Sequence, residues 1–431
     1  MHGLRKVNDG ACIRTLDGCI CHMVPADFCR RSRDANHAVL HSFTLFDDGG
    51  LPHNGMTVDQ HGVFYGVTQY GGDRGCDLGG VPGCGVLYQL KRAGSGWILS
   101  TLHEFHDGPF PTTPGVPTVG PNGTVYGGTW QGGANSAGLI YHATPLPRVP
   151  PTPEAPWNYN PILQFAGDND GGYPSRYAPL RFDAAGNFYG SADGGGLFGA
   201  GVVFEMMPTG SGWTENVLYN FTGSSDGAVP EGVVFDSQGN MYGVGKAGGN
   251  TQQCGGYGCG TVFELSHSGS GWTETTLHTF QEGVDGGWSG PLIRDSAGNL
   301  YGITTRWGPQ SGGTVWELTP SSGGWTFTVL YSFPVTTAGD YGPYALALDP
   351  AGNLYGITNW GGANNTGFLF KLAPSNGSWS YTDLWDFTAR GGTGAGCYPQ
   401  GTPLLDAQGN IYDAAEECGE FNDGTIWMFT P

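Results

Sequence analysis

The chain has 431 residues, and at about 100–200 residues per domain this length suggests two or three domains. Its 17 basic and 37 acidic residues give a net charge of −20, which disfavours nucleic acid as a partner because a phosphate backbone would be repelled. No segment approaches the roughly 18 consecutive apolar residues of a membrane-spanning helix, so none is predicted. The 79 glycines are unusually many, but 38% hydrophobic residues exclude a disordered chain and favour short strands joined by turns.

A phrase built around Gly-Asn-x-Tyr-Gly occurs in four full copies and three weaker ones, most clearly at residues 298–302 in the run DSAGNLYGIT. Its tyrosines are 61, 63, 53, 59, 54 and 57 residues apart, a period that indicates a repeat array forming one radially closed domain. Each copy reads as an Asp-x-x-Gly turn followed by a short apolar strand. Because every repeat shares the phrase, we interpret it as scaffold. The seven tyrosines are Tyr65, Tyr126, Tyr189, Tyr242, Tyr301, Tyr355 and Tyr412.

Each repeat reads as four β-strands, here named a to d in chain order. In the fifth repeat these are GPLIRD, NLYGIT, GTVWEL and WTFTVLYSF. The phenylalanine that ends strand d occurs once before the first a–b pair, as Phe43 in AVLHSF, whereas the last repeat stops at its strand c. The sequence therefore predicts an all-β, seven-bladed β-propeller with four-stranded antiparallel blades. Its ring is closed by residues 38–44, which complete the last blade, so that residues 38–431 form the propeller and residues 1–37 a separate arm.

The ten cysteines are even in number and form local clusters, which predicts disulfides and an oxidising, extracellular setting. Two of the candidate pairs flank matching loops of the first and fourth repeats, and a third joins two loops of the last blade. A metal site is the alternative, but no histidine lies at ligand spacing near the first two pairs. The three candidate pairs are Cys76 with Cys84, Cys254 with Cys259, and Cys397 with Cys418.

The arm, residues 1–37, is basic and contains four further disulfide candidates, whereas the propeller is acidic. It is predicted to be either a tail pinned to its own domain or an arm that reaches a neighbouring subunit and supports self-association. A zinc site in this arm is a weaker alternative. Residues 1–25 lack an apolar core of about 7–15 residues, so no secretory signal is recognisable in this numbering. The four cysteines are Cys12, Cys19, Cys21 and Cys29.

The motifs GNLYGIT, GCGTVFEL and SGWTETTLHTF resemble those of the GloVer-type (Gloeo-Verruco) tandem repeat proteins, which are exported bacterial β-propellers. The resemblance covers residues 38–431. It implies an extracellular or cell-surface propeller and provides no catalytic activity to carry over. Many members carry a C-terminal sorting segment, whereas this sequence stops at its final strand. The arm is therefore the expected attachment element.

The positions that follow strand b differ from repeat to repeat, and we expect function where repeats depart from their template. Aromatic side chains beside amides and charges suit sugars, which need a flat apolar face and partners for their hydroxyls. This face is predicted to bind a glycan or another surface polymer. The alternative is that the aromatics only pack against neighbouring loops. The candidate ligand-binding residues are Tyr70, Trp130, Asp193, Lys246, Arg306, Trp307, Asn359 and Trp360.

The loops between strands d and a repeat an Asp-Gly pair, which is first of all turn chemistry. Calcium is the alternative, with Asp168 and Asp170 as weak candidate ligands because they lie two residues apart. No other cofactor or metal is expected.

The sequence contains no Ser/His/Asp order and no HExxH motif, which disfavours an enzyme, and no catalytic residue is predicted. Histidines that share one column of strand d are interpreted as packing residues. Three functions are carried forward: a non-catalytic extracellular binding or adhesion propeller, a filament subunit linked through residues 1–37, and a polysaccharide lyase or glycoside hydrolase. Only the last would use Glu416 and Glu417 as an acid/base pair.

Overall fold

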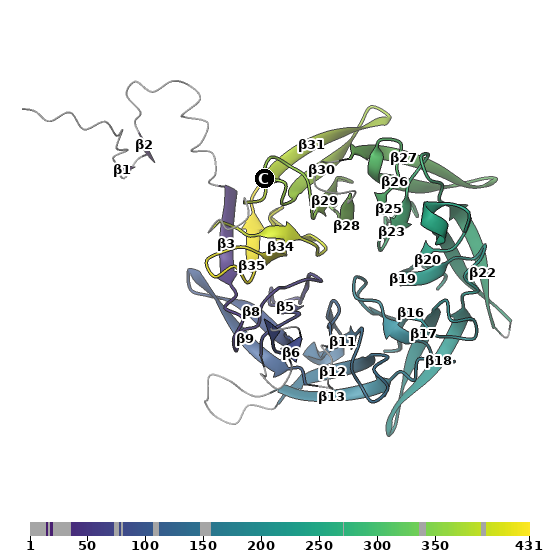
Figure 1. The fold of residues 1–431 in the computed structure, drawn as a ribbon, viewed down its shortest axis with the longest axis horizontal. Coiled ribbons are helices and arrows are strands. Elements are labelled where there is room, and N and C mark those ends of the chain that lie inside the picture. The colour runs from purple at the N-terminus through teal and green to yellow at the C-terminus, as the bar shows by residue number, and fades with distance from the viewer. Residues whose placement is uncertain are drawn as a thin grey trace, which may run out of the picture.

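In the computed structural model the chain forms a ring of seven antiparallel sheets around an axis (Figure 1). The structure describes residues 36–72, 83–106, 112–146, 157–269, 271–335, 342–388 and 394–431, together with the backbone of four short strands. Three predictions concern residues 1–37, whose side chains are outside the described part of the chain except for residues 36 and 37. They are the pairing of the four cysteines, a zinc site and self-association through this arm. The short strands are β1 (Arg14–Thr15), β2 (Gly18–Cys19), β6 (Asp77–Leu78) and β7 (Val81–Pro82).

The strands of each blade are given from the ring axis outwards; this is chain order in blades 1 to 6, whereas in blade 7 the N-terminal β3 is outermost (Figure 1). Blade 1 consists of β4 (Met56–Val58), β5 (Phe64–Val67), β8 (Val86–Ala93) and β9 (Gly96–Glu104). Blade 2 consists of β10 (Thr118–Val119), β11 (Val125–Thr129), β12 (Leu139–Pro145) and β13 (Trp157–Gln164). Blade 3 consists of β14 (Gly172–Pro174), β15 (Arg181–Phe182), β16 (Phe188–Gly194), β17 (Val202–Thr209) and β18 (Gly212–Asn220). Blade 4 consists of β19 (Ala228–Phe235), β20 (Met241–Ala247), β21 (Thr261–Ser268) and β22 (Gly271–Thr279).

The remaining blades follow the same order. Blade 5 consists of β23 (Gly287–Ser289), β24 (Ile293–Arg294), β25 (Leu300–Arg306), β26 (Ser311–Ser321) and β27 (Gly324–Pro334). Blade 6 consists of β28 (Pro343–Leu348), β29 (Leu354–Thr358), β30 (Phe368–Ser375) and β31 (Ser378–Asp386). Blade 7 consists of β32 (Cys397–Pro399), β33 (Leu404–Leu405), β34 (Ile411–Glu417), β35 (Thr425–Phe429) and β3 (His37–Ser42). No α-helix occurs among the described residues, and no helix there is long and apolar enough to cross a membrane.

The N-terminal strand closes the ring, as the count of strand-d phenylalanines predicted. Strand β3 pairs antiparallel with β35, with Val39 opposite Trp427 (Figure 1). The outermost strand of blade 7 therefore comes from the start of the propeller, and the seven-bladed fold is confirmed. Closure in this way leaves no free edge between the first and last blades.

The repeated phrase forms a hydrogen-bonded turn at the a–b corner of the blades. In blade 5 the carboxylate of Asp295 accepts hydrogen bonds from the backbone N–H of Asn299 at 2.8 Å, from the Asn299 side chain at 2.8 Å and from the Tyr301 hydroxyl at 3.2 Å. Trp379, which opens strand d of the next blade, packs against the Tyr301 ring at 6.1 Å between centroids. The phrase therefore fixes its own turn and joins two blades, which explains why it recurs along the chain.

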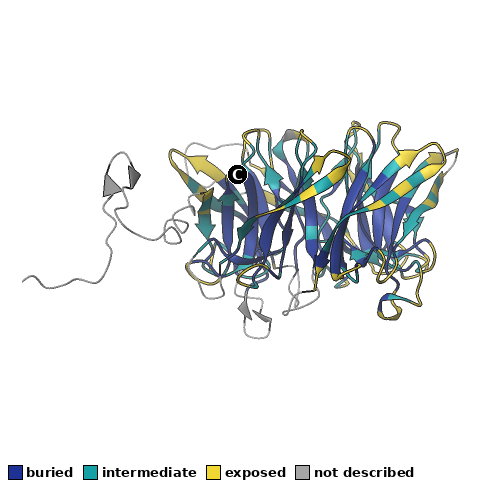
Figure 2. Cartoon of the chain, turned by 90° about the horizontal axis from the view of Figure 1, so that it is seen from above, coloured by how far each residue is buried: buried dark blue, intermediate teal, exposed yellow. Residues whose placement is uncertain are grey.

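The glycine after that tyrosine is required by close packing inside the blade. A Cβ atom at Gly302 would overlap the buried indole of Trp316 on strand β26, and the equivalent glycines face an aromatic ring in the same way. Blade 7 is the exception, because Asp413 replaces glycine there and is completely buried. The buried strands form a continuous layer within the disc, and the exposed residues gather at its surfaces (Figure 2).

At or shortly before strand a, six blades contain a residue with left-handed backbone geometry, although none of these residues is glycine. In blade 5 this residue is Trp288, whose φ is 57° and whose N–H donates to the Cys259 carbonyl of blade 4 at 3.0 Å. Such geometry costs about 1–3 kcal/mol for a bulky residue and persists where the surroundings impose it. The six residues are Leu51, Thr113, Tyr173, Val229, Trp288 and Tyr398.

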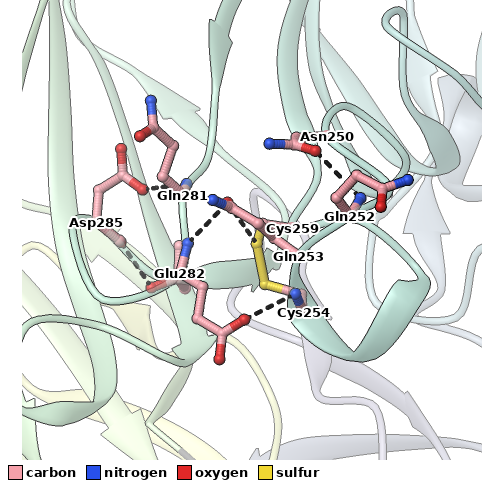
Figure 3. Close-up of a disulfide and its surroundings, with 9 residues drawn as sticks. Asn250, Gln252, Gln253, Cys254, Cys259, Gln281, Glu282 and Asp285 are labelled. Carbon is pink, nitrogen blue, oxygen red and sulfur yellow. Dashed lines mark hydrogen bonds between the residues drawn. A yellow bond between two sulfur atoms is a disulfide. The ribbon is translucent and has the colours of Figure 1, made fainter.

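Two predicted disulfides are confirmed. Cys254 pairs with Cys259, and Cys397 pairs with Cys418. Around the first pair, the N–H of Cys254 donates to Glu282 at 2.9 Å, which ties the b–c loop of blade 4 to the segment leading into blade 5 (Figure 3). Cys84 is buried and disulfide-bonded, and its predicted partner Cys76 lies outside the described residues.

Candidate functional site

The end of strand b and the beginning of strand a lie side by side at one mouth of the ring axis. In blade 7, for example, Pro399 pairs with Ala415, which places Glu416 beside the start of strand a. The residue four positions after the template tyrosine occupies this place in every blade, and its identity is different each time. These seven residues are Gln69, Trp130, Asp193, Lys246, Thr305, Asn359 and Glu416. We call this end of the ring the channel mouth.

Several predicted site residues belong to the last residues of strand b and do not follow it. Asp193 belongs to β16, Lys246 to β20 and Arg306 to β25. Strand b is longer than the sequence predicted, because its last residues pair with the first residues of strand a, as Arg306 does with Gly287. The sequence analysis placed these residues after strand b, whereas the structure places them within it.

Blades 6 and 7 form a pocket of about 340 Å³ at the channel mouth. Three aromatic side chains line it together with two amides and two carboxylates. The predicted residues Asn359 and Trp360 are both part of this lining. The full lining is Tyr344, Asn359, Trp360, Tyr398, Gln400, Glu416 and Glu417.

The Cys397–Cys418 disulfide supports the wall of this pocket. Both sulfurs are buried and pack with Tyr398, and Trp360 lies against this cluster. The rings of Trp360 and Tyr398 are 4.7 Å apart at an angle of 52°. The aromatic wall is thus held by a covalent link between the first residue of β32 and the residue that follows β34, so it is preformed.

On the polar lining of the pocket, Glu416 has a hydrogen-bond partner and a nearby imidazole. The Gln400 side chain donates to one of its oxygens, and His53 of blade 1 lies 3.2 Å from the other. Asn359 is buried, and its Nδ2 has no hydrogen-bond partner in the described part of the chain. The pocket therefore offers an unused amide donor beside aromatic faces.

Blades 2, 3 and 4 form a second group at the channel mouth. The indole N–H of Trp130 donates to Asp193 Oδ2 at 3.2 Å, and the Arg176 guanidinium lies 4.7 Å from the centre of the Trp130 ring. Lys246 pairs with the buried Glu231 at 3.2 Å. The predicted residues Trp130, Asp193 and Lys246 are therefore brought together.

Burial and neighbouring charges shift the pKa values of Asp193 and Lys246. Burial and the negative charge of Glu231 raise the pKa of Asp193 to about 8, against the opposing effects of Lys246, Arg176 and the Trp130 hydrogen bond. Burial disfavours the charge on Lys246, but the carboxylate of Glu231 outweighs it and the pKa of Lys246 is raised. At neutral pH Asp193 is therefore mainly protonated and Lys246 is charged.

Arg306 and Trp307 form a separate group in blade 5. The Arg306 guanidinium lies 4.9 Å from the centre of the Trp288 ring and 6.0 Å from that of Trp307, and the two indoles meet edge to face at 5.0 Å. Tyr70 contributes mainly through its backbone, which forms a bridge with Gly50. The eight predicted residues thus share one face and divide into three groups, with Tyr70 apart from them.

The aspartates of the d–a loops are used in their own turns. Asp170 accepts a hydrogen bond from the backbone N–H of Ala166 at 2.8 Å, and the carbonyl of Asp168 accepts from Gly171 at 3.2 Å. Among the described residues no three His, Cys, Asp or Glu side chains are grouped to hold a metal ion. Calcium binding at this pair stays a prediction.

The strand-d histidines pack between blades, as predicted. His103 stacks on Tyr159 of the next blade at 3.7 Å, and His278 stacks on Phe327 at 3.8 Å. Burial, with a smaller effect of His106, lowers the pKa of His103 to about 4. The neutral, stacked imidazole of His103 is a packing group, whereas His278 also contacts Asp285, with Nε2 and Oδ2 2.7 Å apart.

Comparison with known proteins identifies the family. The sequence profile of the Gloeobacter/Verrucomicrobia repeat matches residues 76–255, 152–341 and 249–431. The chain belongs to this repeat family. The resemblance recognised in the motifs is therefore confirmed, and a search of curated proteins gave no significant match.

Solved structures similar to this repeat protein share the propeller fold at low identity. The extracellular domain of a proposed one-component system from B. thetaiotaomicron matches at 11% identity and a TM-score of 0.52, covering 92% of this chain and 40% of that chain. A proposed gluconolactonase matches at 14% identity and a TM-score of 0.41, covering 82% and 95% of the two chains. A proposed oxidoreductase of the glucose dehydrogenase type from Thermus thermophilus matches at 13% identity and a TM-score of 0.41, covering 90% and 98%. These likenesses concern the fold alone.

Residues at and around the start of strand a also lie at the channel mouth, and they were not predicted. The repeat alignment contained a usable signal, since the residue after the strand-a proline also varies from blade to blade. For this repeat family both columns need to be compared. The additional residues are His53, Arg176, Tyr177, Glu231, Tyr344, Tyr398 and Gln400.

Proposed function

We propose that this chain is a non-catalytic extracellular propeller that binds a saccharide in the pocket between blades 6 and 7. The pocket supports this proposal, because aromatic rings line it together with carboxylates and amides. A sugar ring needs both kinds of surface, since its C–H faces stack on aromatic rings and its hydroxyls pair with polar groups.

The rigidity of the pocket favours binding. Trp360 and Tyr398 are held by the Cys397–Cys418 disulfide, and Glu416 is held by Gln400 and His53. A site whose side chains are fixed before the ligand arrives loses little conformational entropy on binding.

An extracellular setting is part of the proposal. Two disulfides are formed within the described residues, and Cys84 is disulfide-bonded as well. Such bonds form and persist in oxidising environments.

A saccharide screen with two variants tests the proposal. The purified protein would be titrated calorimetrically with a panel of bacterial and plant polysaccharides, beside Trp360→Ala and Tyr257→Ala. Tyr257 is a matched control because it is an aromatic residue of a b–c loop, 69% exposed and outside the pocket. We expect Trp360→Ala to lose at least about tenfold in affinity while Tyr257→Ala binds as the wild type does.

The melting temperature of each variant would establish that the fold is retained. No binding to any member of the panel, or equal binding by Trp360→Ala and the wild type, would contradict the proposal.

A further inference from the structure

Blade 3 carries an insertion at the channel mouth that no other blade has. Nine positions separate its strand-a proline, Pro174, from its turn aspartate, Asp183, whereas six or seven separate the equivalent residues of the other blades. The additional length lies between β14 and β15 and contains Arg176 and Tyr177. An insertion confined to one repeat is not needed by the template, so its side chains are candidates for function.

The insertion places Tyr177 over the ring axis. Its ring lies 6.4 Å from His53 of blade 1 and 6.5 Å from Tyr344 of blade 6, and Lys246 Nζ of blade 4 lies 5.1 Å from its centre. These blades stand on different sides of the ring, so a side chain that approaches all of them lies across the mouth of the channel (Figure 1).

Tyr177 thereby connects the pocket to the opposite side of the ring. Tyr344 belongs to the pocket lining and faces Tyr177, whose ring centre lies 5.3 Å from the Arg176 guanidinium. Arg176 in turn lies over Trp130, and Trp130 contacts Tyr173 at 5.3 Å between ring centres. Flat faces therefore follow one another from blade 6 across the axis to blade 2, further than one sugar ring extends.

Arg176 is the cation beside Trp130, at the blade 2 end of this row of aromatic rings. Its guanidinium contacts aromatic faces, and it forms no ion pair within 4.0 Å in the described parts of the chain. The Nε atom is buried without a hydrogen-bond partner. An arginine presented in this way has donors free for a planar, bidentate partner such as a carboxylate.

The neighbouring charges leave the charge of Arg176 largely uncompensated. Lys246 is paired with Glu231, whose other oxygen accepts a hydrogen bond from Ser175 at 2.8 Å. Asp193, the remaining acid, has its pKa raised to about 8 by burial and by Glu231, so it is mainly neutral at pH 7.

We propose that the saccharide of the blade 6–7 pocket is part of a linear acidic polysaccharide, which continues over Tyr177 and places a uronate carboxylate on Arg176. This inference rests on the proposed function of the pocket and names its ligand class. The acidic lining formed by Glu416 and Glu417 receives neutral hydroxyls, and the cationic end receives the carboxylate. The chain recognises both the length and the charge of its ligand.

A length series tests both features at once. Oligogalacturonates and oligomannuronates of two to six units would be titrated calorimetrically, beside the same oligomers with their carboxylates reduced to alcohols. We expect affinity to rise at least about tenfold from the disaccharide to the hexasaccharide. We expect the acidic hexamer to bind at least about tenfold more tightly than its reduced form.

Two variants of the insertion and one control variant test whether the insertion causes these effects. Arg176→Gln should remove the preference for the acidic form, and Tyr177→Ala should weaken the hexamer while leaving the disaccharide unchanged. Lys371→Gln is the matched control, since Lys371 lies on strand c of blade 6 beside the template Tyr355 and should have no effect. Melting temperatures would verify the fold of each variant.

The outcomes separate the two proposals. Equal binding of acidic and reduced oligomers, no dependence on length, or an unchanged Arg176→Gln would overturn the acidic-ligand inference while the pocket proposal stands. If no oligomer of either kind binds and the polysaccharide panel is also negative, both proposals fail. A preference that Arg176→Gln abolishes and Lys371→Gln retains would support them.

Discussion

The a–b turns and the channel mouth are built from the same seven repeats, yet they differ in how much they vary. At the turns of blades 3 to 7 an aspartate, an asparagine and a tyrosine recur with nearly the same geometry. For example, Asn187 donates to Asp183 at 2.9 Å and Asn353 donates to Asp349 at 2.7 Å. At the channel mouth, seven different side chains occupy one template position.

The difference separates folding from function. A turn that every blade needs in order to form and to contact its neighbour is repeated, because each blade faces the same physical problem. A position at the mouth faces the axis and has no such common task, so it is free to carry binding chemistry. Changes at the turns and inside the blades should therefore alter stability, and changes at the mouth should alter binding.

Asp413 breaks this rule inside a blade and should show the largest effect on stability. Burial raises its pKa to about 8, whereas in the unfolded chain it titrates near pH 4. Between these values only the folded state holds the proton, so stability falls as the pH rises from about 4 to about 8 and is constant above that. At about 1.4 kcal/mol per pKa unit, the loss amounts to several kcal/mol.

Asp413→Asn should remove that pH dependence. Urea unfolding from pH 4 to pH 9 would then give a flatter profile than the wild type, and the variant would be more stable at pH 8. Burial, with a smaller effect of Asp413, raises the pKa of Tyr88, so Tyr88 stays protonated in both proteins over this pH range. Parallel profiles for the two proteins would contradict this role of Asp413.

Gly302→Ala should cost about 3 kcal/mol, because the added methyl group meets the fully buried Trp316 ring. Urea unfolding would measure the change. Gly271→Ala is the matched control, since a Cβ atom there meets nothing within 4 Å. Equal stability of the two variants would show that the template glycine is not held by packing.

Asp295→Ala should cost about 2 kcal/mol, because three donors of the turn lose a charged acceptor. Asp295→Asn retains an acceptor oxygen and should lose less. Thermal unfolding of both variants checks this order. A loss in Asp295→Asn as large as in Asp295→Ala would mean that the charge matters and the turn hydrogen bonds do not.

The smallest effect is expected at the channel mouth, on binding as a function of pH. As the pH rises through about 8, Asp193 ionises beside Arg176, Lys246 and Glu231 and partly neutralises the cationic end. The affinity for an acidic hexasaccharide should fall about threefold between pH 7 and pH 9. Calorimetry at the two pH values would show this in the wild type and not in Asp193→Asn. An equal fall in both would assign the effect to another group.

The fold could be predicted from the sequence because the same residue types recur at equivalent positions of the seven repeats. The seven tyrosines, the glycine that follows most of them and the additional Phe43 fixed blade number and closure. In blades 3, 5 and 7 strand a is split into two strands of two or three residues, because Gly and Pro interrupt its hydrogen-bonded ladder. This split was not predicted.

The site was predicted only in part, for a physical reason. Residues at the end of strand b could be found by comparing repeats, and Asn359 and Trp360 do line one pocket. Their partners at the start of strand a come from a neighbouring blade or from across the axis. Tyr177 meets His53 and Tyr344 only after the ring has closed, so sequence spacing contains no record of these contacts.

The most direct test compares Trp360→Ala with Asp295→Ala in two assays, urea unfolding and calorimetric titration with a saccharide that the wild type binds. We predict that Trp360→Ala loses at least about tenfold in affinity and changes the free energy of unfolding by less than about 1 kcal/mol. Asp295→Ala should lose about 2 kcal/mol of stability and bind normally. If Trp360→Ala kept its affinity, or if both variants lost binding in proportion to stability, the separation between scaffold and site would be wrong.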